Sequence, residues 1–397
     1  MKNILFYYDN FCGEGARGGT EVATFRIAGA LSRSGEWQVF NAFQSRFGGS
    51  GKSIYTDVVQ LQKPKSLFTG RLAEFIRCHN IDVVVNMGRF FRHAKLKESI
   101  IKSGRDVKLI FMHHFAPGSE SRKSTYSSAL HLLRLNPLNP LYYLRLLFYP
   151  LLKLPRTLAW PGIYKEVYES SDRVILLSEG YKDIYRQVAG LKTGDKFTAI
   201  QNIFDAPATV GGVKKEKRVL MLSRMDEIQK RISLALKIWK KIEDSGEFAD
   251  WHLDIVGSGH DFKGVKRLAR TLRLSNVTFH GWKESRPFLE KSSILMMTSA
   301  YEGLSLSMLE AMAYGCVPVA FDSYASLRDV VDDSVNGLAV APFGDVDTFA
   351  QRLASLMRDN TLLSGMAKHG MAAADKFSSE KIGAKWLLML ENLTKNQ

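Results

Sequence analysis

The chain of 397 residues lacks several features that would assign it to a particular class of protein. It has only three cysteines, and Cys12, Cys78 and Cys316 lack the paired spacing of a disulfide framework or a zinc site. No stretch reaches about 18 uncharged apolar residues, so we expect no transmembrane helix. The apolar run at residues 4–8 is too short for the core of a signal peptide and suits a first β-strand. These absences predict a cytoplasmic protein with reduced thiols and no structural metal.

Acidic residues are too few to balance the basic ones. Lys and Arg total 55 against 40 Asp and Glu, and the net charge of +15 implies an anionic partner. The excess of basic residues is greatest in residues 121–165, which contain basic side chains and not one Asp or Glu. These basic residues are Arg122, Lys123, Arg134, Arg145, Lys153, Arg156 and Lys165.

The centre of that stretch, residues 135–155, is rich in Leu and Tyr and is interrupted by prolines (LNPLNPLYYLRLLFYPLLKLP). Apolar bulk beside unpaired cations, too short and too broken to span a bilayer, indicates a surface that lies in the lipid interface. The alternative is a buried helical hairpin whose Arg and Lys ends reach solvent. We favour an anionic membrane surface, because buried cations without nearby acids are costly. Nucleic acid is disfavoured, because no basic motif with interleaved aromatics recurs elsewhere.

Short β-branched runs alternate with amphipathic helical stretches along the whole chain. Continuous apolar strands divided by helices predict an α/β fold of parallel sheets covered on both faces. The pattern starts twice, with a joint at residues 201–218, and a chain of this length favours two domains. We expect helices at 20–34, 232–245, 305–315 and 378–393. We expect strands at 3–8, 82–87, 107–112, 173–178, 196–200, 218–223, 252–257, 276–280, 294–299 and 317–321.

Ligands of open parallel sheets bind beyond the carboxyl ends of the strands, so the loops after strands are candidate sites. After the first strand, Gly18 and Gly19 precede a helix and would let backbone amides approach an anion; a tight turn is the alternative. After the strand at 218–223, Arg224 and Lys230 could neutralise a diphosphate; a solvated charge pair is the alternative. Gly257 follows a later strand.

Further candidates lie in the second half of the chain. Gly281 and Trp282 follow the strand at 276–280 and, like Gly257, could expose backbone to a flat ring or simply form turns. Glu302 precedes a predicted helix and Glu310 lies inside it, with the free amides of Gly303, Leu304, Ser305 and Leu306 between them. A ligand that carries hydroxyls, then phosphates, then further hydroxyls would fit this arrangement. A nucleotide sugar is such a ligand. A helix cap and a buried salt bridge are the alternative.

Several of these stretches resemble the retaining glycosyltransferases of the GT-B fold, in particular the GT4 family. Residues 298–320 (TSAYEGLSLSMLEAMAYGCVPVA) resemble its E-x7-E signature, except that Leu304 and Ser305 replace an aromatic residue and a glycine. Residues 223–231 (SRMDEIQKR) resemble its donor-phosphate element, and residues 15–21 (GARGGTE) resemble its glycine loop. Later sequence motifs of the family have counterparts at residues 255–259, 277–282 and 335–340.

The resemblance implies two Rossmann-like domains facing a central cleft. Residues 1–205 would form an acceptor-binding domain that includes the membrane segment at about 121–165. Residues 206–377 would bind the nucleotide sugar, and residues 378–397 would form a helix that returns to the N-terminal domain. The resemblance covers most of the C-terminal domain and the first 35 residues of the chain.

The resemblance also implies roles for individual residues. Glu310 would accept hydrogen bonds from the ribose hydroxyls, and Arg224 with Lys230 would bind the diphosphate, helped by the amides of residues 304–306. Glu302 would hold hydroxyls of the donor sugar near the reacting carbon. No metal and no cofactor beyond the donor would be needed, since cationic side chains and a helix terminus can stabilise phosphate charge.

Two further residue pairs resemble parts of the family's N-terminal domain. His113 and His114 follow the strand at 107–112, where the family has a histidine near the sugar and the acceptor. The sequence leaves open which of them faces the cleft and slightly favours His114. Gly19, preceded by Gly18, would lie close to the donor phosphates or the incoming hydroxyl.

These features together predict a metal-independent, retaining glycosyltransferase that acts by front-face displacement. Its acceptor would be a lipid-linked glycan of a bacterial surface polysaccharide, and the enzyme would lie on the inner face of the cell membrane. A transferase with a soluble acceptor and a non-catalytic nucleotide-sugar or nucleic-acid binding protein remain alternatives. An oxidoreductase is disfavoured, because the first loop lacks a clean dinucleotide-binding pattern.

Overall fold

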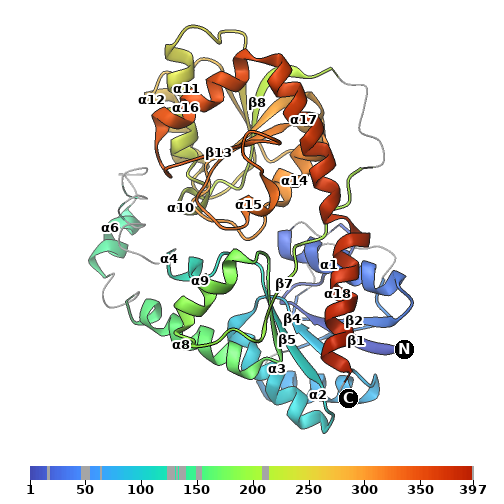
Figure 1. Cartoon of the computed structure of the whole chain (residues 1–397). Helices are drawn as coiled ribbons and strands as arrows, with labels where there is room; N and C mark the ends of the chain where they lie inside the picture. The colour runs from blue at the N-terminus through green and yellow to red at the C-terminus, as the bar shows by residue number, and fades with distance from the viewer. Residues whose placement is uncertain are drawn as a thin grey trace. The chain divides into compact units, whose positions relative to one another are not determined.

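The computed structural model describes residues 1–15, 18–45, 54–62, 65–122, 130, 133, 140–148, 154–207 and 214–395. The chain divides into two compact units (Figure 1). The first unit comprises residues 1–117, 159–205 and 377–397, and the second comprises residues 118–158 and 206–376. The sequence suggested boundaries after residues 205 and 377. Residues 118–158 group with the second unit, whereas we expected them in the N-terminal domain.

The first unit is built on a seven-stranded parallel sheet with the order β3-β2-β1-β4-β5-β6-β7. The order reverses between β1 and β4, which pair in parallel with Ile4 opposite Val83. All four residues of β4 are buried, as expected for a strand covered on both faces. The strands are β1 (Lys2–Tyr7), β2 (Trp37–Phe43), β3 (Asp57–Gln60), β4 (Val83–Asn86), β5 (Lys108–His113), β6 (Arg173–Leu176) and β7 (Phe197–Ala199).

Helices cover this sheet, and the last helix of the chain is one of them. Trp386 of α18 is fully buried and meets Phe6 of β1 edge to face, with ring centroids 6.3 Å apart. The Lys2 ammonium donates to the Thr394 hydroxyl at 2.5 Å, and α18 runs beside α1 (Figure 1). The helices are α1 (Gly19–Arg33), α2 (Lys65–Cys78), α3 (Phe90–Ser103), α8 (Leu154–Ser170), α9 (Gly180–Ala189) and α18 (Ser379–Thr394).

The second unit is built on a six-stranded parallel sheet with the order β10-β9-β8-β11-β12-β13. Here the order reverses between β8 and β11, where Leu220 pairs with Leu295. The strands are β8 (Glu216–Leu222), β9 (His252–Val256), β10 (Val277–Gly281), β11 (Ser292–Met297), β12 (Val317–Phe321) and β13 (Leu338–Val340). Two parallel, Rossmann-like sheets confirm the predicted fold class.

A continuous apolar core joins this sheet to its helices. Trp239 of α11 and Phe349 of α16 are fully buried in it, together with Phe321 of β12. The helices are α4 (Ser119–Arg122), α6 (Pro140–Leu147), α10 (Glu227–Lys230), α11 (Ile232–Asp244), α12 (Phe262–Thr271), α13 (Arg286–Lys291), α14 (Leu306–Ala313), α15 (Leu327–Val330), α16 (Val346–Arg358) and α17 (Asn360–Ala374), and the 3-10 helix Asp375–Phe377 follows.

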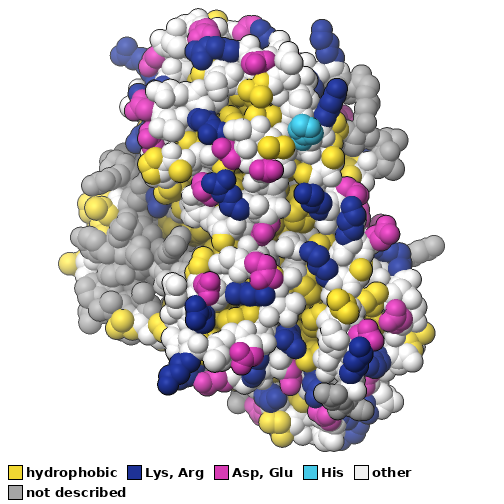
Figure 2. Space-filling model, viewed as in Figure 1, with side chains coloured by type: hydrophobic (Ala, Val, Ile, Leu, Met, Phe, Trp, Pro, Cys, Tyr) yellow, Lys and Arg dark blue, Asp and Glu magenta, His cyan; other side chains and the backbone are white. Residues whose placement is uncertain are grey.

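Part of the predicted membrane segment is described. Leu141, Leu144 and Leu147 of α6 are 62%, 50% and 71% exposed, so this short helix presents apolar side chains to solvent. Lys153 and the side chain of Arg145 lie outside the described residues. No helix in the described part of the chain is long and apolar enough to cross a membrane. On the face drawn in Figure 2, basic and acidic side chains are interspersed over the molecule.

Candidate functional site

The candidate site of the second unit lies at the carboxyl edge of its sheet, where the strand order reverses. Arg224 lies in the loop after β8, and Lys230 is the last residue of α10, which follows that loop. Glu302 lies in the loop after β11, the strand that pairs with β8. Parallel neighbours end at the same edge, so two segments far apart in sequence meet at the edge where open sheets bind ligands.

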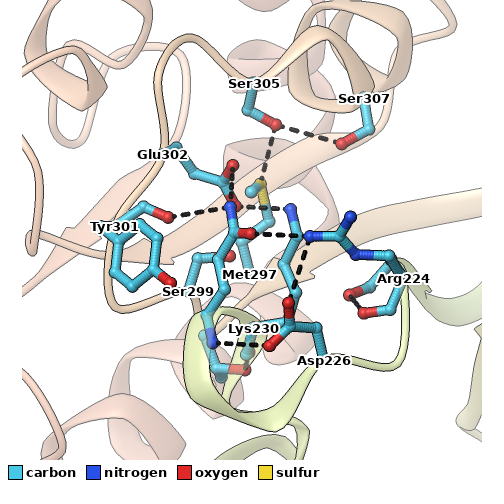
Figure 3. Close-up of polar contacts among 12 residues, drawn as sticks. Arg224, Asp226, Lys230, Met297, Ser299, Tyr301, Glu302, Ser305 and Ser307 are labelled. Atoms are coloured by element: carbon cyan, nitrogen blue, oxygen red, sulfur yellow. Dashed lines mark hydrogen bonds and ion pairs between the residues drawn. The ribbon is translucent and has the colours of Figure 1, made fainter. Parts of the chain in front are cut away.

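Lys230 and Glu302 form the centre of this site (Figure 3). The Lys230 ammonium lies 2.5 Å from Glu302 Oε1, and the two side chains are only 15% and 8% exposed. Gln229 Nε2 donates to the other carboxylate oxygen, Oε2, at 3.2 Å. Both oxygens of a buried carboxylate are therefore bound, as a buried charge requires.

Arg224 joins the same network through Gln229. One guanidinium nitrogen, Nη2, donates to Gln229 Oε1 and to Asp226 Oδ2, each at 3.1 Å. The side-chain amide of Gln229 thus links Arg224 to Glu302, while the Arg224 side chain stays 57% exposed. The structure therefore brings Arg224, Lys230 and Glu302 together in one place.

The sequence analysis missed Gln229 and Asp226, although a signal was present. Asp226 caps α10, because its Oδ1 accepts a hydrogen bond of 3.2 Å from the backbone amide of Gln229. An acid followed three residues later by Gln resembles a capping box, which marks a helix start. The pattern could have located α10, but the bridging role of the Gln229 side chain depends on where β11 ends.

The backbone at Lys230 is fixed from the β11 side. The Thr298 hydroxyl lies 2.9 Å from the Lys230 carbonyl and 3.0 Å from that of Arg231, and the Ala300 amide donates to the Gln229 carbonyl at 2.7 Å. Arg231 has a φ of 50°, a left-handed conformation that breaks α10 from α11. These bonds position the Lys230 side chain before any ligand arrives.

Helix α14 carries the second glutamate of the predicted pair. Ser305 is its N-cap residue, but its hydroxyl does not cap the helix, because it contacts Met297 Sδ at 3.6 Å and Ser307 Oγ at 3.1 Å. Leu304 and Ser305 are each 6% exposed, and Glu310 is half-buried inside the helix. Gly303 lies in the loop between Glu302 and α14, and Leu306 is the first residue of that helix.

The predicted glycines of the second unit have different environments. Gly257 has a φ of 139°, and a Cβ there would lie 1.9 Å from the Ser223 carbonyl oxygen, so close packing of two loops explains this glycine. The Gly257 amide donates to the Gly281 carbonyl at 2.7 Å. Trp282 is 64% exposed, so its ring is accessible to a planar ligand.

The predicted residues of the first unit lie at the start of α1 and at the end of β5. Gly18 is the N-cap of α1 and Gly19 its first residue. A Cβ on Gly18 would lie 2.0 Å from Glu21 Oε2, so the Glu21 carboxylate lies against the start of this helix. Asn10 holds that carboxylate by a hydrogen bond of 2.9 Å.

The two histidines differ in their surroundings. The His113 ring is 1% exposed and packs at 5.2 Å from Phe90, 5.6 Å from Tyr164 and 6.0 Å from Tyr185, inside an aromatic cluster. His114 is 7% exposed, and burial together with the neighbouring His113 lowers its pKa to about 3. His114 is therefore neutral near pH 7. His113 is part of the buried core of the first unit.

Comparisons with known proteins show what this chain is similar to. Residues 205–372 match the family model of glycosyl transferases group 1. An uncharacterized glycosyltransferase of Haemophilus influenzae is 24% identical over 97% of this chain and 99% of its own length. The poly(glycerol-phosphate) alpha-glucosyltransferase of Bacillus subtilis is 26% identical over 58% of this chain, and the match spans only 35% of that relative.

A solved structure extends the similarity to both units. HepE from Anabaena, solved in complex with UDP-glucose, superimposes with a TM-score of 0.71 over 99% of this chain and 100% of its own, at 16% identity. At that identity the likeness shows the fold alone. The chain therefore has the GT-B fold, and its residues 205–372 are similar to the glycosyl transferases of group 1.

Proposed function

We propose that the chain is a retaining glycosyltransferase that transfers a sugar from a nucleotide-diphosphate sugar to a glycan acceptor. The observation that carries this proposal is the network of Arg224, Gln229, Lys230 and Glu302 at the carboxyl edge of the second sheet. Two cations, a buried acid and the amino end of α14 meet there, which suits a ligand with a diphosphate beside sugar hydroxyls.

Donor binding exchanges the partners within this network. The diphosphate takes the Lys230 ammonium and the exposed Arg224 guanidinium, and the amides at the start of α14 add further donors. Glu302 is then released from Lys230 and can accept hydrogen bonds from hydroxyls of the donor sugar, while Gln229 keeps the carboxylate in place. Glu310, further along α14, accepts hydrogen bonds from the ribose.

Transfer proceeds by front-face displacement. The bond between the anomeric carbon and the phosphate oxygen breaks, and the acceptor oxygen forms its bond on the same face. The proton of the acceptor hydroxyl passes to the departing phosphate oxygen. Arg224, Lys230 and the α14 amides stabilise the developing charge on the nucleotide diphosphate, and this stabilisation requires no metal at the phosphates.

The similar proteins support the substrate classes. HepE was solved with UDP-glucose, which favours a nucleotide sugar as donor here. The Bacillus relative is named for poly(glycerol-phosphate), and a relative from Salmonella typhimurium, 32% identical over 30% of this chain, is named lipopolysaccharide 1,6-galactosyltransferase. We therefore place the acceptor among bacterial surface polysaccharides.

We further propose that the acceptor is lipid-linked and that the enzyme lies on the inner face of the membrane. The exposed leucines of α6 support this, in a segment without acidic residues. Leu147→Asp should weaken sedimentation with vesicles of anionic phospholipid. The matched control is Leu388→Asp, since Leu388 of α18 is comparably exposed at 61%. Equal sedimentation of both variants and the parent would favour a soluble acceptor.

Slow hydrolysis of donors tests the transferase itself. We expect the purified chain to release nucleotide diphosphate from one member of a panel of UDP- and GDP-sugars. Lys230→Ala should abolish this release, whereas Lys266→Ala, at an exposed lysine of α12, should leave it unchanged. Salt-dependent RNA binding without donor turnover would instead support a non-catalytic binding protein.

A further inference from the structure

Three side chains able to bind a cation lie together in the second unit, next to the loop that carries Arg224. They are Asp226, which caps α10, and His260 and Asp261, which precede α12. One ligand atom of each lies within 4.8 Å of the others. None of the three contacts the donor in the mechanism proposed above.

Two loops in close contact bring these side chains together. The Met225 amide donates to the Ser258 carbonyl at 3.0 Å, and the Asp261 amide donates to the Met225 carbonyl at 3.2 Å. A Cβ on Gly259 would lie 2.5 Å from the Met225 carbonyl oxygen, so only glycine permits this approach. The carboxylates of Asp226 and Asp261 are therefore held near one another by the backbone.

The pair of acids is incompletely compensated. Asp226 is 8% exposed and Asp261 is fully buried. Arg224 donates a hydrogen bond to Asp226. Asp261 Oδ2 accepts a hydrogen bond from the backbone amide of Glu227 at 2.8 Å and lies 3.1 Å from His260 Nε2. Asp261 Oδ1 is buried and has no hydrogen-bond partner within the described part of the chain. A buried carboxylate oxygen left in this state is costly, and a cation would satisfy it.

We propose that Asp226, His260 and Asp261 bind a divalent first-row transition ion such as Mn²⁺ or Zn²⁺. Two carboxylates and an imidazole form a mixed oxygen and nitrogen ligand set that suits these ions, whereas Mg²⁺ and Ca²⁺ prefer oxygen ligands alone. Bonds of about 2.0–2.2 Å require the three groups to close slightly around the ion. The His260 side chain is 56% exposed and can rotate to do so.

The ion has a consequence for the neighbouring site. It competes with Arg224 for the Asp226 carboxylate, because Asp226 Oδ2 accepts the Arg224 hydrogen bond. Binding of the ion therefore leaves the guanidinium available for an anionic ligand. The site is linked to the donor network through the Arg224–Asp226 hydrogen bond, but binding of the ion requires neither a donor nor sugar transfer.

Calorimetric titration of the metal-free full chain with MnCl₂ tests the proposal. We expect one saturable site, with a dissociation constant raised about tenfold or more by His260→Ala and by Asp261→Asn. His369→Ala is the matched control, since His369 is another exposed histidine of the second unit, and it should bind as the parent does. His260 is exposed, so its variant stays informative if Asp261→Asn fails to fold.

A second readout separates the site from adventitious binding. The electron paramagnetic resonance signal of free Mn²⁺ should fall on adding the parent chain or His369→Ala and stay higher with His260→Ala. Absence of saturable Mn²⁺ and Zn²⁺ binding by the parent would overturn the proposal. So would equal affinity in the parent, His260→Ala and Asp261→Asn. Neither result touches the transferase proposal, which donor hydrolysis tests independently.

Discussion

The ion pair between Lys230 and Glu302 allows a quantitative prediction about stability. Removing one partner of a buried pair leaves an uncompensated charge and costs about 3–5 kcal/mol. In Lys230→Met, Glu302 would be left as a charge that is only 8% exposed, but it would keep its hydrogen bond from Gln229. Lys230→Met should therefore lower the free energy of unfolding by about 3 kcal/mol, the lower end of that range. Glu302→Gln in the same chain removes the stranded charge and should restore about 2 kcal/mol of that loss.

The assay is a double-mutant cycle in urea, followed by circular dichroism. The parent, Lys230→Met, Glu302→Gln and the double variant give a coupling energy for the pair. If the chain unfolds in two transitions, one for each unit, the free energies to compare among the four proteins are those of the transition that shifts in the single variants. A coupling energy below about 0.5 kcal/mol would refute the reasoning, because the two groups would then not depend on each other.

Three other predictions follow from the same structure. Glu310→Gln should weaken donor binding about tenfold in calorimetric titration, because it removes a charged acceptor worth about 1.5 kcal/mol, whereas Glu290→Gln should not. The pKa of His114 is lowered to about 3, so at this group the unfolded chain binds more protons than the folded chain as the pH falls below about 6.5. His114 alone should therefore contribute a loss of about 2 kcal/mol in stability between pH 7 and pH 5, and His114→Gln should remove that contribution in urea titrations. Gly257→Ala should cost more than about 2 kcal/mol in the same titration because of its backbone clash, and more than Gly246→Ala, where φ is also positive but no atom lies nearby.

Most of the fold could be predicted from the sequence because buried parallel strands are continuous apolar runs. All ten predicted strands are present, and β12, at 317–321, has the predicted bounds. The strands that were missed lack that signal. Trp37–Phe43 contains Gln38 and Asn41, Asp57–Gln60 is short and has one buried residue, and β13 has only three residues.

The candidate site was predictable in part. Arg224, Lys230 and Glu302 follow strands, so their meeting at one sheet edge follows from parallel pairing. The role of Gln229 could not be predicted, because it depends on the exact approach of two loops far apart in sequence. The same holds for Asp226 with Asp261, whose proximity results from the close contact at Gly259.

The distinction between His113 and His114 also required the structure. Adjacent strand residues point to opposite faces, but the sequence does not say which face holds the aromatic cluster. Phe90, Tyr164 and Tyr185 come from three separate segments, and together they enclose His113. His113 therefore belongs to the core of the first unit, and the role of His114 stays a prediction.

The most direct measurement of the central claim is calorimetric titration of UDP and GDP into the parent, Lys230→Ala and Glu302→Gln. The claim is that the diphosphate takes Lys230 away from Glu302. It predicts that Lys230→Ala binds the preferred nucleotide at least about tenfold more weakly, whereas Glu302→Gln binds it as tightly as the parent or more tightly, because the competing carboxylate is gone. Unchanged affinity in Lys230→Ala, or a loss of affinity in Glu302→Gln equal to that in Lys230→Ala, would contradict the account.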